Sequence, residues 1–128
     1  MSATITITSL VAKTLIVLVA LEHLYFLYLE MFAWAAPRTR KAFGTTLEFA
    51  QASKTLAANQ GLYNGFLAAG LFCSLIGPLA SGRLAILFLA FVIIAALYGG
   101  FSVNRRILFI QGLPALAALI SIFFHKAA

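Results

Sequence analysis

The feature that most constrains this chain is a series of long, nearly uninterrupted apolar runs. A helix needs about 20 apolar residues to cross the hydrocarbon core of a bilayer. Four runs of about this length cover residues 10–34, 56–79, 84–103 and 107–124. In lipid the backbone must satisfy its own hydrogen bonds, which a helix does. The runs therefore predict four transmembrane helices.

Composition excludes an ordinary soluble domain. Hydrophobic residues make up 63% of the 128 residues and charged residues 9%, with a mean hydropathy of +1.04. A soluble domain of this size buries only about two-thirds of its unfolded surface, so several apolar runs would stay exposed to water. We expect an integral membrane protein surrounded by membrane lipids.

Short polar segments between the runs predict the topology. They begin at Pro37, Gly77 and Asn104, and short connections force neighbouring helices to run antiparallel. The prediction is an all-α, up-down four-helix transmembrane bundle, with residues 1–128 forming a single transmembrane domain. The more polar stretch from Phe43 to Lys54 has two interpretations, an interfacial helix leading into the second span or a solvated extension of that span.

Basic residues predict the orientation. Six of the nine Lys and Arg residues fall in the first and third connections: Arg38, Arg40, Lys41, Lys54, Arg105 and Arg106. The other three, Lys13, Arg83 and Lys126, fall in the termini and the second connection. Because Lys and Arg in short loops stay on the cytoplasmic side, both termini are expected outside the cytoplasm. His125, beside Lys126, is interpreted as a solvated terminal residue. Basic residues spaced between apolar runs form no single basic face, so no nucleic-acid partner is expected.

The first run carries three ionisable residues, Glu22, His23 and Glu30. They argue against a cleaved signal peptide, whose hydrophobic region is shorter and uncharged. Ionisable groups inside a membrane are costly and are functional candidates by default. His23 and Glu30 are seven residues apart, so they project from nearly the same face of a helix.

The other three runs also carry polar residues, at depths that match. These are Asn59, Gln60, Tyr63, Asn64, Tyr98 and Gln111. At about 1.5 Å per residue, all of them fall in the cytoplasmic half of the bilayer with Glu30. With Glu22 and His23, they predict a pocket open to the cytoplasm that binds a small lipophilic or polar ligand. The alternative is that Asn, Gln and Tyr side chains only hold helices together through hydrogen bonds.

Small residues and the single cysteine add two expectations. Cys73 is the single cysteine of the sequence and lies in an apolar run. An internal disulfide and a Cys/His metal cluster are therefore excluded. No metal site is expected from the residues alone. Gly61 and Gly65 have the small-xxx-small spacing that lets helices approach closely, either within the chain or in a homodimer.

Three classes of function fit these residues, and the sequence leaves open whether the chain is an enzyme. The first is a transporter of a small solute or protons, for which a homodimer is expected because four helices are few for a transport path. The second is a membrane-embedded enzyme acting on a lipophilic substrate with His23 and Glu22 or Glu30 as an acid/base pair, or with a metal or haem on His23 as a sub-case. The third is a structural helper subunit of a larger membrane complex. No cofactor is indicated.

Several motifs together resemble a known family. They are Leu21-Glu22-His23 through Glu30, Ala58-Asn59-Gln60-Gly61-Leu62-Tyr63-Asn64-Gly65, Tyr98-Gly99 and Gln111-Gly112-Leu113-Pro114-Ala115. Across nearly the whole chain, the sequence resembles domain-of-unknown-function family 1304, a family of small bacterial membrane proteins. The resemblance implies a four-helix, multi-pass protein of the bacterial inner (plasma) membrane. It implies no activity, substrate or cofactor.

Overall fold

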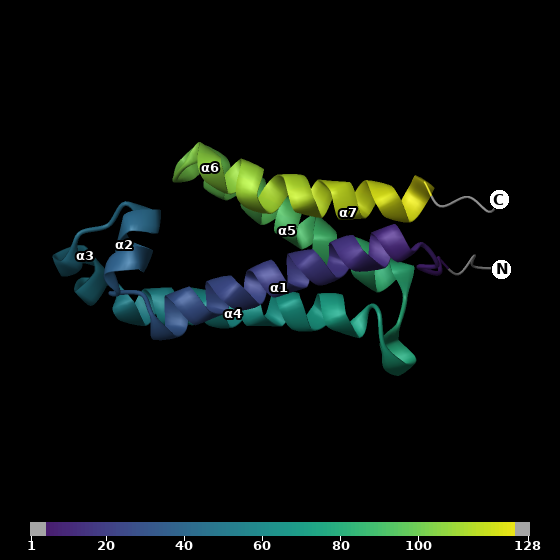
Figure 1. The fold of residues 1–128 in the computed structure, drawn as a ribbon, viewed down its shortest axis with the longest axis horizontal. Helices are drawn as coiled ribbons and strands as arrows, with labels where there is room; N and C mark the ends of the chain where they lie inside the picture. The colour runs from purple at the N-terminus through teal and green to yellow at the C-terminus, as the bar shows by residue number, and fades with distance from the viewer. Residues whose placement is uncertain (1–4, 125–128) are drawn as a thin grey trace. The chain divides into compact units, whose positions relative to one another are not determined.

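The computed structural model describes residues 5–124, and every regular element among them is a helix (Figure 1). The elements in chain order are α1 (Leu10–Phe32), α2 (Pro37–Phe43), α3 (Leu47–Ala52), α4 (Lys54–Cys73), η1 (Gly77–Leu79), α5 (Gly82–Ser102), α6 (Arg105–Ile107), η2 (Leu108–Gly112) and α7 (Leu113–Phe124). No strand occurs in the described part of the chain. His125 and Lys126 lie outside it, so the interpretation of these two residues is not addressed by the structure.

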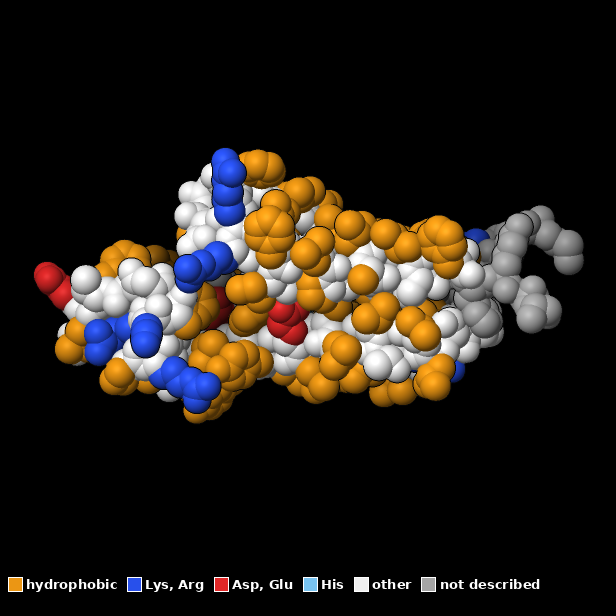
Figure 2. All heavy atoms as spheres, turned by 45° about the horizontal axis from the view of Figure 1, so that its top comes forward, with side chains coloured by type: hydrophobic (Ala, Val, Ile, Leu, Met, Phe, Trp, Pro, Cys, Tyr) orange, Lys and Arg blue, Asp and Glu red, His pale blue; other side chains and the backbone are white. Residues whose placement is uncertain are grey.

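Three helices are long and apolar enough to cross a membrane: Leu10–Phe32, Gly82–Ser102 and the continuous Arg105–Phe124 segment. They correspond to the first, third and fourth predicted spans. Large apolar side chains are exposed along them, including Leu10, Ile94 and Phe123, and hydrophobic side chains cover much of the face shown in Figure 2. Contiguous apolar surface of this kind suits lipid rather than water.

The second predicted span differs most from the structure. Residues 54–73 form α4, which is 20 residues long but is not among the helices apolar enough to cross a membrane. It carries Lys54, Asn59 and Gln60 in its first half and Asn64 directly after, and these residues lower its hydropathy. The helix also ends before the predicted limit at residue 79. Gly77 adopts a φ of 67°, and Gly77–Leu79 forms a separate 3₁₀ turn with Pro78 in it.

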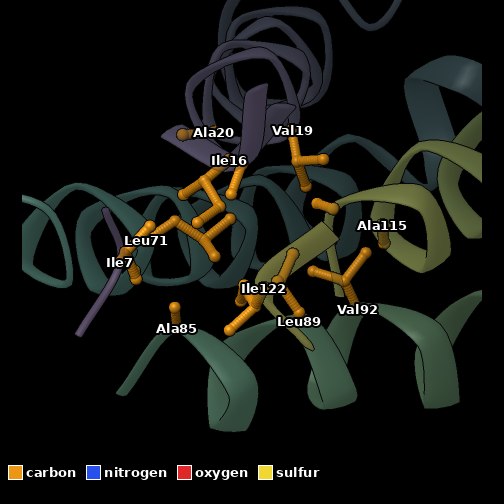
Figure 3. Close-up of a cluster of buried hydrophobic side chains, with 12 residues drawn as sticks. Ile7, Ile16, Val19, Ala20, Leu71, Ala85, Leu89, Val92, Ala115 and Ile122 are labelled. Atoms are coloured by element: carbon orange, nitrogen blue, oxygen red, sulfur yellow. The ribbon is translucent and has the colours of Figure 1, made fainter. Parts of the chain in front are cut away.

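The chain divides into two compact units, and the first contains Met1–Leu21 and Leu67–Ala128. Its core is a cluster of buried apolar side chains from α1, α4, α5 and α7, shown in Figure 3. Ile16, Leu71 and Leu89 are its largest fully buried members. Alanines fill many of the remaining positions, so helix backbones can approach closely.

Two local features shape the helix Arg105–Phe124 in this unit, a cap at its start and a π-helical turn after it. Asn104 caps it, its side-chain oxygen accepting the Arg106 N–H at 2.9 Å. Residues Leu108–Gly112 then form a π-helical turn, η2, just before Pro114. A proline has no N–H to donate to the preceding turn, and a wider turn is one way a helix accommodates this loss. Gln111 lies in η2.

The second unit, Glu22–Phe66, contains the end of α1, the short helices α2 and α3, and the start of α4. Pro37 occupies the first turn of α2, and Gly44 ends that helix with a φ of 68°. Thr46 caps α3 by accepting the Phe49 N–H at 3.1 Å. Three basic residues, Arg38, Arg40 and Lys41, belong to α2, whereas α3 has Glu48 in its first turn.

Trp34 joins these short helices into one folded connection. Its indole N–H donates to Ser53 Oγ at 3.0 Å, and its ring meets that of Phe43 edge-on at 5.0 Å between centroids. The stretch from Phe43 to Lys54 is thus a capped helix followed by a turn at Ser53, rather than a straight extension of α4. Trp34 therefore has both a polar and an apolar contact in this connection.

Candidate functional site

Glu30 is the centre of the polar cluster in the second unit. It lies in the last turns of α1, and only 3% of its surface is exposed. Gln60 Nε2 donates to Glu30 Oε1 at 2.8 Å, and Asn64 Nδ2 donates to Glu30 Oε2 at 2.6 Å. Each carboxylate oxygen therefore accepts a hydrogen bond from a different amide. We call Glu30, Gln60 and Asn64 the carboxylate–amide site.

The helical repeat explains why two amides reach one carboxylate. Gln60 and Asn64 are four residues apart, so they project from the same face of α4. Gln60 is exposed, and Asn64 is half-buried. The site is therefore buried at the carboxylate and reaches the surface of the described chain through Gln60.

Gly61 allows the two helices to come this close. A Cβ at position 61 would lie 2.8 Å from Met31 Cγ, 3.0 Å from Glu30 Cβ and 3.2 Å from the Leu27 carbonyl oxygen. Gly65, one turn further along α4, also faces Leu27 of α1. The small-xxx-small spacing thus forms a contact within the chain, which was one of its two predicted uses. The two helices run antiparallel here, because Gly65 comes later than Gly61 on α4 but contacts a residue that comes earlier on α1.

Glu22 and His23 lie two turns before Glu30 on α1. His23 has 1% of its surface exposed, and its ring meets Phe26 edge-on at 5.5 Å between centroids. Glu22 is half-buried, and its Oε2 is buried with no hydrogen-bond partner among the described residues. Of the three ionisable residues of the first run, His23 and Glu30 are thus buried and Glu22 is half-buried.

The other predicted site residues fall in different settings. Asn59 is exposed, and Tyr63 is 59% exposed with its ring edge-on to Phe66. Tyr98 and Gln111 belong to the first unit. Tyr98 is 77% exposed and borders a shallow apolar hollow on α5 with Phe101, whereas Gln111 is half-buried. Of the nine predicted residues, the structure joins Glu30, Gln60 and Asn64 by hydrogen bonds. One shared pocket for all nine stays a prediction.

Two contributors to the site were not singled out as site residues from the sequence. Leu27 and Met31 flank Glu30 and form the surface against which Gly61 fits. Apolar residues in an apolar run do not stand out as site residues. Their closeness to Glu30 on the same helix was the sequence feature that could have indicated their role. In the described part of the chain, no group of three or more His, Cys, Asp or Glu side chains is placed to hold a metal ion.

The fold and the site together define a class: an all-helical protein with several helices able to cross a membrane and a buried carboxylate held by two amides. Comparison with known families identifies it further. The chain belongs to the family described as Protein of unknown function (DUF1304), whose model matches residues 17–123. The matched range includes every predicted site residue, which agrees with the resemblance seen in the motifs.

A curated relative agrees with this assignment. The uncharacterized protein YpaA of Lactococcus lactis subsp. lactis (strain IL1403) is 40% identical over 109 residues, which cover 84% of this chain and 92% of that protein. No solved structure matches the chain. The relative's description names no activity, so the argument for function rests on the residues themselves.

Proposed function

We propose that this protein is a multi-pass protein of the bacterial inner membrane that binds a proton or a small cationic solute at Glu30 and moves it through a polar pocket open to the cytoplasm. The observation that carries the proposal is the carboxylate–amide site. Glu30 is 3% exposed, and each of its carboxylate oxygens accepts a hydrogen bond from an amide N–H. A buried carboxylate is energetically costly in a helix whose surface is suited to lipid. In the part of the chain that the structure describes, the hydrogen-bond partners of the Glu30 side chain are amides rather than Lys or Arg.

The two amides support exchange of a proton in particular. In the structure both amides donate, which suits a deprotonated Glu30. Asn and Gln side chains present oxygen instead of nitrogen when the amide turns over. When Glu30 is protonated, one of the two amides can therefore turn over and accept its O–H, while the other still donates to the second oxygen. A carboxyl group with partners in both protonation states can gain and lose a proton without leaving a buried polar group unsatisfied.

The proposal requires α4 to be the fourth membrane helix of an up-down bundle. Its 20 residues would extend about 30 Å, the thickness of the hydrocarbon core. The polar side chains that lower its hydropathy include Gln60 and Asn64, which donate to Glu30 rather than to solvent. Their cost in lipid is thus reduced by internal hydrogen bonds. With four crossings and the basic residues of the first and third connections inside, both termini lie outside the cytoplasm.

Reconstitution into liposomes tests the proposal. Purified protein in vesicles that contain a pH-sensitive dye is exposed to a proton gradient, with and without alkali cations or small amines outside. We expect wild-type protein to change the internal pH faster than empty vesicles and Glu30→Gln to abolish the difference. Glu48→Gln is the matched control, because Glu48 lies exposed at the start of α3. Equal rates for Glu30→Gln and wild type would refute transport through Glu30.

A second candidate is a membrane-embedded enzyme in which His23 and Glu22 form an acid/base pair on a lipophilic substrate. The buried Glu22 Oε2 without a hydrogen-bond partner in the described chain favours it. Mass spectrometry of gently purified protein tests this candidate. A lipid or small molecule kept by wild type and by Glu30→Gln but lost from His23→Ala would support the enzyme over the transporter. A structural helper subunit is indicated if a deletion strain is fully complemented by both variants.

A further inference from the structure

The first unit contains a second hollow, between residues 5–7 and the beginning of α5. It has a volume of about 230 Å³ and is lined by three segments: residues 5–7, the first turn of α1, and the connection from α4 to α5. Its polar lining residues are Thr6, Lys13, Ser74 and Ser81. We call it the N-terminal hollow.

Backbone hydrogen bonds hold the walls of the hollow. The Gly82 N–H donates to the Ile5 carbonyl at 2.8 Å, which ties residues 5–7 to the start of α5. A side chain at position 82 would overlap Ile5, so a glycine is required for this approach. The Ser81 N–H donates to the Ser74 carbonyl at 3.0 Å and closes the α4–α5 connection. The hollow is therefore a feature of the fold.

Two of the polar side chains in the lining, Lys13 and Ser81, can donate hydrogen bonds to a ligand, whereas the Ser74 hydroxyl donates to the Leu71 carbonyl at 2.6 Å. The Lys13 ammonium carries three N–H donors. Ser81 Oγ accepts the N–H groups of Arg83 and Leu84, at 3.2 and 3.4 Å, so its hydroxyl hydrogen can be donated to a ligand. A ligand that matches these groups is negatively charged and rich in acceptor oxygens, as a phosphate group is. Ile5, Ile7 and Leu75 supply an apolar wall beside them.

The charged side chains of the first unit are all basic. All three acidic residues of the chain, Glu22, Glu30 and Glu48, belong to the second unit. The first unit carries Lys13 with several arginines and no Asp or Glu side chain. Lys13 therefore has no carboxylate side chain in its own unit to neutralise it.

We propose that the N-terminal hollow binds a phosphate group through Lys13 and Ser81, carried by a phospholipid headgroup or as inorganic phosphate. This site is independent of the proposed transport at Glu30. The apolar wall fits the glycerol end of a lipid, and a free phosphate needs only the polar groups. Both sources use the same chemistry, so the test separates them.

Thermal unfolding of the full chain in a non-ionic detergent, measured during ligand titration, tests the proposal. The probes are phosphatidylglycerol, diacylglycerol without phosphate, and inorganic phosphate. We expect phosphatidylglycerol to raise the melting temperature of wild type and Lys13→Gln to weaken its apparent affinity about tenfold, as loss of a charge-assisted hydrogen bond does. Lys13→Arg should restore it. Arg105→Gln, which removes a charge from the same unit outside the hollow, should bind as wild type.

The outcomes are distinct. A shift that depends on Lys13 with phosphatidylglycerol, and is absent with diacylglycerol, supports a lipid headgroup. A shift that depends on Lys13 with inorganic phosphate supports free phosphate. If wild type and Lys13→Gln respond equally to all three probes, or neither responds, the hollow is not a phosphate site. Each outcome is independent of proton flux, so failure here leaves the proposal for Glu30 unaffected.

Discussion

Asn64 donates its side-chain N–H to Glu30 at 2.6 Å, across 34 residues of sequence. The bond joins α4 to α1 at a point where neither helix could satisfy its polar group alone. It also explains how a carboxylate is retained in a helix otherwise suited to lipid, since each of its oxygens has a donor.

A double-mutant cycle should detect this bond as a coupling energy. Glu30→Ala and Asn64→Ala, singly and together, are expected to be non-additive by about 0.5–2 kcal/mol, the range for polar pairs between membrane helices. Stability is measured by reversible unfolding in mixed micelles. The cycle of Glu30→Ala with Asn59→Ala is the control, because Asn59 is exposed on the same helix. Equal coupling in both cycles would contradict the geometry.

Gly61 should tolerate a methyl group less well than Gly112. Both replacements by alanine gain a similar helix propensity, but a Cβ at 61 lies 2.8 Å from Met31 Cγ, whereas one at 112 meets Ala96 Cβ at an ordinary 3.4 Å. We expect the free energy of unfolding of Gly61→Ala to be about 1–3 kcal/mol lower than that of Gly112→Ala. The same micelle assay measures both variants, and equal stability would argue against the close contact.

Ser53 should determine how tightly the only tryptophan is held. Trp34 donates to Ser53 Oγ at 3.0 Å, so Ser53→Ala removes the acceptor and lets the indole move. We expect stronger quenching of Trp34 fluorescence by acrylamide and a loss of about 1 kcal/mol. Ser102→Ala is the control, because the Ser102 hydroxyl donates to the Tyr98 carbonyl in the other unit. Quenching that changes equally in both variants would refute the assignment.

Asn104 should determine where the last of the long apolar helices begins. Its side chain caps the N-terminus by accepting the Arg106 N–H, and loss of such a cap costs about 0.5–2 kcal/mol. Asn104→Ala should lower stability by this amount, and Asn104→Asp, which keeps the acceptor, should restore most of it. Hydrogen exchange at residues 105–108 checks the cause, because only these amides should exchange faster in the alanine variant.

Cysteine labelling should establish the orientation. In a Cys73→Ala background, which removes the only native thiol, we expect Arg38→Cys and Arg105→Cys to react only from the cytoplasm and Arg83→Cys only from outside. An impermeant reagent applied to intact cells and to inverted vesicles gives the comparison. Labelling of Arg38→Cys and Arg83→Cys from the same side would show that α4 does not cross the membrane.

Much of the local structure could be read from short-range patterns. The apolar runs predicted four transmembrane helices, and three helices in the described part of the chain are long and apolar enough to cross a membrane. The helices that begin at Pro37 and directly after Asn104 follow the ordinary proline and capping preferences. The limits of α4 were harder to predict from the sequence. The apolar run lies between a polar first half of the helix and the Gly77-Pro78 turn, and neither boundary is marked by the run itself. The π turn at Leu108–Gly112 was not expected, although Pro114 was a signal for it.

By itself, the sequence determined the helical class, the three apolar helices and the family, because these depend on hydrophobic runs and motifs that lie within one segment. Only the tertiary structure decided which predicted residues meet. Helical spacing placed Gln60 and Asn64 on one face, but their pairing with Glu30 depends on how α4 lies against α1 and on Gly61 leaving room for it. Hydrogen bonds between distant segments depend on packing over the whole contact, which no local pattern specifies.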